Sequence, residues 1–369
     1  MMKHNSALAA AIRLDRTDPG PYQVYADWLQ LNGSPLGELL ILLQSHDAKS
    51  LKCADEIVAA LKLPTENVTY GWQLGMWSWL RFETEDSLNE DFDAAGFARE
   101  PFVSPLCAVL QRLRIGMLRW EHNYEDVPAV IAEAGRYPWA SELPELHVGD
   151  IDDNIDMAHH TVGAIGQAIS RAFPKLEWLT VKSSEQDYRE VATFSVANLA
   201  LPRLRELVIE TCSMSKQRVA EVLAAKLPKL ERLELWFGDA EYGADATLAE
   251  LGELLNGRVF PDVRQLGLRN AMFTDQLVRA LPGSAIAARL ESLDVSMGTL
   301  TNDAALELAA NAPAFPALET LDVDDNFLSP DVIERVQAAF DGKDVVSRRQ
   351  KEPDRSIPGE VHLFVSVHE

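Results

Sequence analysis

The stretch Phe315–Leu328, which reads Phe-Pro-Ala-Leu-Glu-Thr-Leu-Asp-Val-Asp-Asp-Asn-Phe-Leu, decides the fold of this chain. Its apolar residues Leu318, Leu321 and Val323 are spaced by three and then two positions, and Asn326 follows three residues later. Because Leu321 and Val323 alternate with polar residues, the pattern predicts a short strand with one apolar face. The short amide side chain of Asn326 can bond backbone groups of neighbouring turns, so it predicts a turn after the strand.

The same spacing recurs along the chain at intervals of 26 to 33 residues. The clearest further copies are Leu290-Leu293-Val295, Val263-Leu266-Leu268, Leu230-Leu233-Leu235, Leu204-Leu207-Ile209, Leu176-Leu179-Val181 and Leu143-Leu146-Val148, and two weaker copies are Leu110-Leu113-Ile115 and Trp77-Leu80-Phe82. One such strand cannot bury its own apolar face, so the copies are expected to stack. The interval leaves room for a helix of about three turns after each strand.

A helix after the last strand is indicated by Ser329 and Pro330, which are typical of a helix start. Strands and helices in right-handed succession predict a parallel sheet backed by helices on one side. With this spacing and Asn326, the chain resembles leucine-rich repeat proteins of the long, helix-backed class seen in ribonuclease inhibitor. The resemblance implies an α/β solenoid, an arc with a parallel inner sheet and outer helices. At the turn position only Cys212 and Asn326 match the motif, so irregular curvature is expected in the middle of the arc.

Residues 1–65 lack the repeat spacing and are predicted to form a small helical domain that caps the solenoid. Their informative part is Val24–Leu29, Val-Tyr-Ala-Asp-Trp-Leu, followed by Gly-Ser-Pro-Leu-Gly-Glu over Gly33–Glu38 and by a Leu-Gln ending at Gln44. On these residues the segment resembles the bacterial repeat-companion domain, a short module placed ahead of leucine-rich and other repeats. Asp27 is predicted to be a buried hydrogen-bond acceptor that ties two helices together.

The solenoid is predicted to span residues 66–343, and residues 344–369 are predicted to form two capping strands. Asp344–Ser347 and Val361–Val367 alternate in the manner of strands, and the charged residues between them are expected to form a loop.

Composition limits the compartment and the type of partner. Three cysteines, far apart in the 369 residues, argue against a disulfide framework or a four-ligand zinc site and favour a cytoplasmic protein. The N-terminus resembles a helix start and not a secretory signal, and no run approaches the ~18 apolar residues of a membrane span.

The net charge is −23, and residues 290–334 contain ten acidic residues and no Lys or Arg. This balance disfavours a nucleic acid and favours a protein partner with a basic surface. An acidic surface that only maintains solubility is the alternative. The oligomeric state does not follow from the sequence.

Residues between and just after the repeat anchors are expected on the concave surface of the arc. The predicted protein-binding residues are Trp79, Arg81, Arg112, Arg114, Trp178, Arg232, Glu234, Trp236, Phe237, Arg269, Asp294, Asp322, Asp324 and Asp325. Among them Trp178, Trp236 and Phe237 are predicted to be apolar anchors, because exposed aromatic residues rimmed by charge are typical of protein-binding sites. A shift of one residue in register would instead turn Trp236 into the core.

Catalytic and metal motifs are weak in this sequence. A calcium loop could start at Asp322, but Phe327 and Ile333 stand where such a loop needs glycine and glutamate. The acidic cluster between Asp150 and Asp156 could hold an ion, although negative charge ahead of a helix is ordinary. We therefore expect a non-enzymatic binding protein without a cofactor or a metal. The alternatives are a regulatory or immunity-type inhibitor subunit of a larger assembly, and an enzyme with an unrecognised site.

Overall fold

The computed structural model describes residues 4–45, 47–63, 67–84, 91–119, 122–151, 157–185, 192–357 and 359–367. The chain divides into two compact units, each described here by itself. Unit 1 comprises Met1–Ile151 and Ala168–Leu176, and unit 2 comprises Asp152–Gln167 and Glu177–Glu369. The division between the units falls within the predicted repeats and not at the predicted boundaries of residues 65 and 343.

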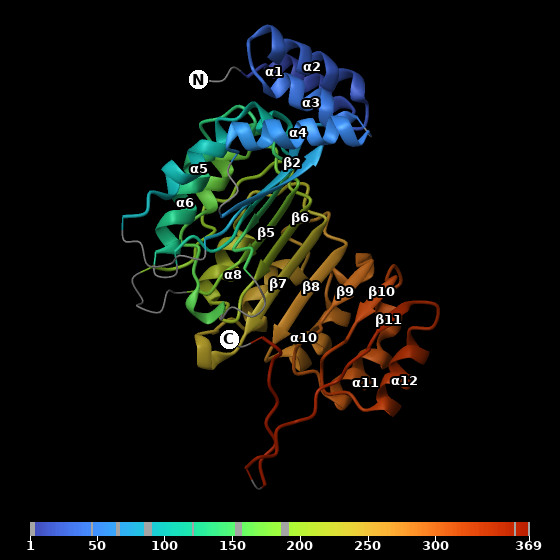
Figure 1. The fold of residues 1–369 in the computed structure, drawn as a ribbon. Helices are drawn as coiled ribbons and strands as arrows, with labels where there is room; N and C mark the ends of the chain where they lie inside the picture. Colours follow the sequence, from blue (N-terminus) through green and yellow to red (C-terminus); the bar gives the residue numbers. More distant parts are fainter. Residues whose placement is uncertain are drawn as a thin grey trace. The chain divides into compact units, whose positions relative to one another are not determined.

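Unit 1 begins with a helical module, shown in blue in Figure 1. Its helices are α1 (Ser6–Leu14), α2 (Pro19–Leu31), α3 (Leu36–Gln44) and α4 (Ala48–Leu61). The start of α2 is fixed by Asp18, whose carboxylate accepts a hydrogen bond from the Gly20 amide. Helices α2 and α3 approach closely at Gly37, where an added Cβ would lie 2.4 Å from the Ala26 carbonyl oxygen. Asp27 is exposed, so its predicted role as a buried acceptor is wrong: it lies on the outer side of α2.

The helical module is attached to the strands of unit 1 by hydrogen bonds to backbone carbonyls. Arg13 Nη1 donates to Ala108 O at 2.7 Å, and Arg16 Nη1 donates to Val109 O at 2.5 Å. These carbonyls belong to a short 3-10 helix, η1 (Pro105–Val109), which precedes a strand. The module therefore contacts the repeat region of unit 1 through specific polar groups as well as apolar ones.

The strands of unit 1 follow one another in sequence order. They are β1 (Val68–Gln73), β2 (Met76–Phe82), β3 (Arg112–Ile115) and β4 (Glu145–Val148), with β1 antiparallel to β2 and the others parallel. The predicted anchors Leu80, Leu113 and Leu146 are paired across the strands and are buried. Helices α5 (Ala94–Phe102) and α6 (Asn123–Ala134) pack on each other, and α7 (Gly166–Ala172) includes residues of both units.

Unit 2 contains a parallel sheet whose strands again lie in sequence order (Figure 1). The strands are β5 (Trp178–Lys182), β6 (Glu206–Glu210), β7 (Arg232–Gly238), β8 (Gln265–Ala271), β9 (Ser292–Asp294), β10 (Thr320–Asp322) and β11 (Asp344–Val346). The helices are α8 (Lys216–Leu223), α9 (Gly252–Leu255), α10 (Thr274–Ala280), α11 (Asn302–Ala310) and α12 (Pro330–Ala339). Leu266, Leu293 and Leu321 are buried neighbours on adjacent parallel strands, as predicted.

The turns after the strands of unit 2 satisfy their buried backbone groups in different ways. Asn326 Oδ1 accepts from Leu300 N at 2.9 Å and its Nδ2 donates to Val295 O at 3.0 Å, which confirms the predicted turn role. Where glycine occupies the same position, at Gly298, the hydroxyl of Thr274 accepts the next backbone N–H instead. An added Cβ at Gly298 would lie 2.1 Å from this hydroxyl oxygen. The absence of a side chain at Gly298 therefore leaves room for the Thr274 hydroxyl.

The chain after β10 differs in part from the prediction. Residues Asp344–Val346 form the predicted strand β11, parallel to β10. Residues 361–367 do not form the second strand; within the described residues 359–367 there is a single antiparallel bridge, between Asp354 and His362. The rest of this segment crosses the carboxyl ends of β8 and β9. None of the helices in the described ranges has the length and apolar content needed to span a bilayer.

Candidate functional site

The candidate site is the face of the unit 2 sheet that lies opposite the helices, here called the open face. Helices cover one face of this sheet (Figure 1). The leucines of β7–β10 are buried, and the residues that alternate with them along the strands lie on the other face. The open face presents Trp178, Glu206, Arg232, Glu234, Trp236, Gln265, Arg269, Asp294, Asp322 and Asp324. The structure thus brings together most of the predicted binding residues that lie in unit 2.

The centre of the open face is a charged network around Glu234, which is buried in spite of its charge. Its carboxylate accepts hydrogen bonds from Arg232 Nη2 at 2.5 Å, Trp236 Nε1 at 2.8 Å and Arg269 Nη1 at 2.8 Å. Burial alone would raise the pKa of Glu234, but these donors lower it overall. Gly267 on the next strand leaves room for this side chain, because an added Cβ would lie 2.8 Å from Glu234 Cγ.

Trp236 is held rigidly within this network. Besides its bond to Glu234, its ring is stacked by the Arg269 guanidinium, which lies 4.8 Å from the ring centroid. The guanidinium also bonds Ser296 Oγ at 3.0 Å and pairs with Asp294 at 3.2 Å. The indole donor is therefore used internally, and the half-buried ring offers only part of its surface to a partner.

The predicted aromatic anchors divide into exposed and buried residues. Trp178 is 40% exposed on β5 and is the large apolar side chain that β5–β11 leave most open on this face. Phe237 is only 1% exposed and packs edge-on against Phe273 at 4.9 Å, so its prediction as an anchor is wrong. The strand alternation places Trp236 outward, and Phe237, which follows it, therefore lies inward.

Two carboxylates from adjacent strands lie side by side on the open face, because Asp294 of β9 is paired in register with Asp322 of β10. Burial, together with the charge of Asp294, raises the pKa of Asp322 to about 6. Burial also raises the pKa of Asp294, and the Arg269 guanidinium partly offsets this effect. At a pH below about 6 the pair therefore holds a proton. At higher pH both carboxylates are charged and attract a cation.

The remaining predicted acids, Asp324 and Asp325, are occupied by the chain itself. Asp324 Oδ1 accepts from the backbone N–H of Arg349 at 2.5 Å, and Asp325 pairs with the Arg349 guanidinium at 3.1 Å. Asp325 is buried, so its prediction as an exposed binding residue is wrong. Glu234 is buried in the same way and acts by positioning Trp236 and Arg269.

In unit 1 the predicted arginines form ion pairs with acids of the same sheet. Arg81 Nε donates to Asp150 Oδ2 at 2.6 Å, Arg114 lies 3.7 Å from the same oxygen, and Arg112 pairs with Glu145. Trp79, the remaining predicted residue, lies over Gly71, where an added Cβ would lie 2.0 Å from its Nε1. Trp79 and the three arginines share one face of the unit 1 sheet, and neighbouring carboxylates largely balance the charge of each arginine.

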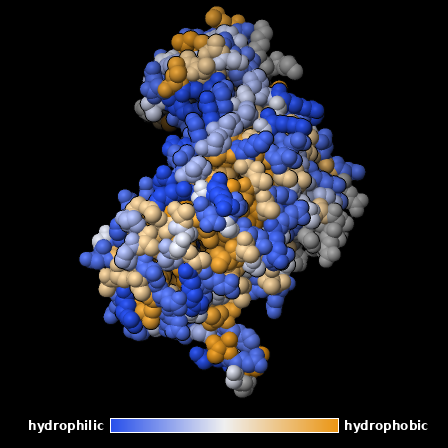
Figure 2. Space-filling view, turned by 180° about the vertical axis from the view of Figure 1, so that it is seen from behind, coloured by the Kyte–Doolittle hydropathy of each residue, from blue (hydrophilic) through white to orange (hydrophobic). Residues whose placement is uncertain are grey.

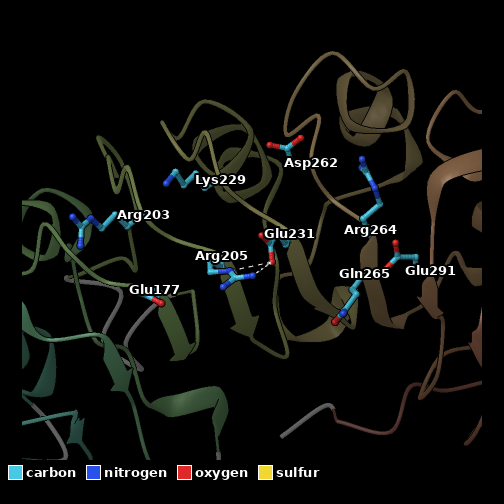
Figure 3. Close-up of a pocket in the computed structure, with 9 residues that line it drawn as sticks. All are labelled: Glu177, Arg203, Arg205, Lys229, Glu231, Asp262, Arg264, Gln265 and Glu291. Carbon is cyan, nitrogen blue, oxygen red and sulfur yellow. Dashed lines mark hydrogen bonds and ion pairs between the residues drawn. The ribbon is translucent and has the colours of Figure 1, made fainter. Parts of the chain in front are cut away.

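A depression of about 780 Å³ lies at the amino-terminal ends of strands β5–β9, and none of the predicted binding residues lines it (Figure 3). Its lining side chains are all polar: Glu177, Arg203, Arg205, Lys229, Glu231, Asp262, Arg264, Gln265 and Glu291. Arg205 and Glu231 form an ion pair at 2.7 Å, marked in the figure. The four cations and four carboxylates balance, so the depression favours neither an anion nor a cation.

Metal-ligating groups were also considered. The described residues contain no cluster of three or more His, Cys, Asp or Glu side chains that could hold a metal ion. Most of the acidic cluster considered from the sequence, Asp152, Asp153 and Asp156, lies outside the described residues. Asp150 accepts hydrogen bonds from arginine, as noted above.

Several residues of the open face and its edge were not found from the sequence. Gly267 leaves room for Glu234 of the neighbouring strand, a role that depends on a contact between strands. Arg349 and Lys351, in a segment predicted to be a loop, reach the ends of β9 and β10. The basic run Arg348–Lys351 was the available signal, because it follows an acidic strip that contains no cation of its own.

Comparisons with known proteins bear on the fold alone. No protein-family model matches this chain, and no curated protein matches it. Among solved structures, the chain is similar to a Bacteroides fragilis protein determined as a structural-genomics target, with a TM-score of 0.65 and 20% sequence identity over 87% of each chain. The common feature is an α/β fold with a mostly parallel sheet.

The face seen in Figure 2 is mixed: hydrophobic residues gather in the middle of the view, and others lie on the helical module at the top. In that module Leu14, Val24, Leu31 and Ile41 are exposed. Isolated apolar residues of this kind are normal on soluble surfaces, and the charged open face of unit 2 remains the stronger candidate.

Proposed function

We propose that this chain is a non-catalytic binding protein built on leucine-rich repeats of the long, helix-backed class, and that the open face of unit 2 binds another protein through a basic surface of that partner. The spacing of the buried leucines and the role of Asn326 support the repeat class. Trp178 is the observation that carries the binding proposal, because this exposed aromatic side chain stands on a sheet face that is rich in charged groups.

The rest of the open face supports the same proposal. Trp236 and Arg269 are already ordered by their internal contacts, so little side-chain entropy would be lost when a partner packs on them. Asp294 and Asp322 present negative charge that a basic surface can neutralise. The arginines of the network carry hydrogen-bond donors as well, so a partner would need acidic or carbonyl groups opposite Arg232.

The first experiment is a pull-down from the source cell with mass spectrometry, followed by binding kinetics of the identified partner. Trp178→Ala should speed dissociation about 10-fold or more, since an aromatic anchor commonly contributes about 2 kcal/mol. Leu31→Ala, on α2, is the matched control, because it removes an exposed apolar side chain from a different surface. Unchanged binding by Trp178→Ala, with binding lost in variants of helices α10–α12, would place the site on the helical face.

The pair Asp294 and Asp322 favours the alternative of an enzyme. A carboxyl group with a pKa of about 6 can act as a general acid near neutral pH. An enzyme would hold a substrate beside this pair, so Asp322→Asn would abolish turnover and leave binding of that substrate intact. The binding-protein proposal expects the reverse: slower association with the partner and no turnover to lose.

A further inference from the structure

The segment Lys351–Val367, here called the strap, crosses the carboxyl ends of β8, β9 and β10 and returns toward the middle of the unit 2 sheet. It leaves the end of β10, where Lys351 N donates to Asn326 O at 2.6 Å. It then turns back at the bridge between Asp354 and His362. Its last described residues, Ser366 and Val367, reach Asn270 at the end of β8.

Asn270 recognises only the main chain of the strap. Its Oδ1 accepts from Ser366 N at 3.0 Å and from Val367 N at 2.9 Å, and its Nδ2 donates to Val367 O at 2.6 Å. Asn270 is completely buried, and within the described residues its side chain forms its hydrogen bonds with the strap. If the strap left, this amide would lose these partners, which is costly for a buried polar group.

The residues beneath the strap form a row in the left-handed backbone conformation. Asn270, Met297 and Asp325 have φ values of 53°, 65° and 52°, and each lies three residues after the paired positions Gly267, Asp294 and Asp322. Left-handed backbone is uncommon for residues other than glycine, and asparagine and aspartate adopt it more readily than most. At Met297 it directs the carbonyl oxygen to the strap, where it accepts from Ser366 N at 3.0 Å and from Lys351 Nζ at 3.2 Å.

Two side chains of the strap add selectivity to these main-chain bonds. Val365 is 0% exposed, and the Phe364 ring packs edge-on against Phe327 at 5.4 Å between the centroids. The Lys351 ammonium lies over both rings, 5.0 Å from Phe327 and 5.4 Å from Phe364. Most residues between the two attached ends are exposed, so the arm that carries Phe364 and Val365 can detach without disturbing the sheet.

We propose that the carboxyl edge of β8–β10 is a binding groove for an extended peptide of a partner protein, and that the strap occupies this groove in cis. The fitting peptide has an aromatic residue followed by an aliphatic and a small residue, as in Phe364–Ser366. Asn270 and the Met297 carbonyl bind its main chain, in the manner of other proteins that bind extended peptides. This groove does not use Trp178 or Trp236, so it stands or falls independently of the function proposed above.

The test measures binding of a labelled synthetic peptide with the sequence of residues 361–367 to the full-length chain by fluorescence anisotropy. The unaltered chain should bind the peptide weakly, because its own strap competes at a high effective concentration. Val365→Asp should release the strap and increase the affinity for the peptide at least about 10-fold. Val361→Asp is the matched control: it places the same charge on a residue that is 54% exposed, and it should change nothing.

Adding Asn270→Leu to the released chain should abolish peptide binding. Ser366→Pro gives a second released chain without a buried charge, because proline lacks the N–H that bonds Asn270 and Met297. Hydrogen exchange at residues 363–367 reports release in each case. The proposal is overturned if a released chain binds no peptide, if Asn270→Leu leaves the affinity unchanged, or if the strap stays protected in both variants. Dimers formed by exchange of straps would overturn the assignment to a partner peptide.

Discussion

Single side chains set the chemistry of the open face, and Asp322 is the clearest case. Its carboxylate is half-buried beside Asp294, and the nearest cation, Arg269, is already bound to Glu234 and Asp294. Ionising Asp322 therefore costs more than ionising an exposed aspartate, which is why burial and its neighbour raise its pKa from 3.8 to about 6. When Asp322 is ionised, the open face gains a negative charge and the folded state becomes less stable.

The stability of the folded chain should therefore depend on Asp322 in a defined pH window. Because the folded state holds this proton more tightly than the unfolded state, stability falls as pH rises from about 4 to about 6, and the loss is complete above that. Asp322→Asn should raise the thermal unfolding midpoint at pH 7.5 and give no gain at pH 4, as measured by calorimetry. Glu319→Gln, on an exposed neighbour, is the control. An equal effect of Asp322→Asn at both pH values would contradict this account.

Secondary-structure elements owe their position to a shared apolar spacing. In unit 2, strands β6–β10 each contribute a leucine to a buried row, which runs through Leu207, Leu233, Leu266, Leu293 and Leu321. A strand of three residues such as β10 has few backbone hydrogen bonds of its own. Its stability comes from this row and from the turn that Asn326 ties to the preceding repeat.

Removing one member of the row should destabilise the whole repeat. Leu321→Ala should lower the free energy of unfolding by about 2–5 kcal/mol, because it leaves a cavity between neighbouring strands. Thr320→Ala, one residue earlier on the opposite face, should change it by less than about 1 kcal/mol. Urea denaturation of both variants measures the difference, and equal effects would mean that the two faces of β10 have been assigned wrongly.

At the scale of the whole molecule, the net charge of −23 acts on encounter more than on affinity. Exposed charges act over a Debye length of about 8 Å at physiological salt, so they steer a basic partner during approach. Among these charges, the acids of the open face lie closest to the proposed binding site and should therefore steer the partner most strongly.

The combined change Asp322→Asn and Asp324→Asn should slow association with the basic partner and flatten the dependence of the association rate on salt. Dissociation should change little, because Trp178 supplies the apolar contact. The control is Asp303→Asn with Glu334→Gln, which removes the same charge from exposed positions on α11 and α12. Stopped-flow measurements from about 50 to 500 mM salt make the comparison. If both pairs of changes slow association equally, net charge and not the open face steers the partner.

The strands, their direction and their buried row follow from local patterns in the sequence. Spacings of three and two residues are local, so Leu318, Leu321 and Val323 set the phase of a strand wherever the chain runs. The same alternation predicts that Trp178, Trp236 and Arg269 lie on one face of the sheet. The prediction for Phe237 is wrong because Phe237 directly follows Trp236, and consecutive residues of a strand point to opposite faces.

Which of these side chains are already bound by other parts of the chain depends on contacts between residues far apart in the sequence. Asn270 meets Val367 across 97 residues, Arg81 meets Asp150 across 69, and Arg349 returns to Asp325 across 24. Such pairings depend on the paths of long connections, and local periodicity gives no information about those paths. For the same reason the sequence predicts that Asp27 lies on a helix but does not show that it lies on the exposed side. Residues 361–367 alternate like a strand, yet side chains and turn carbonyls hold them instead of a sheet.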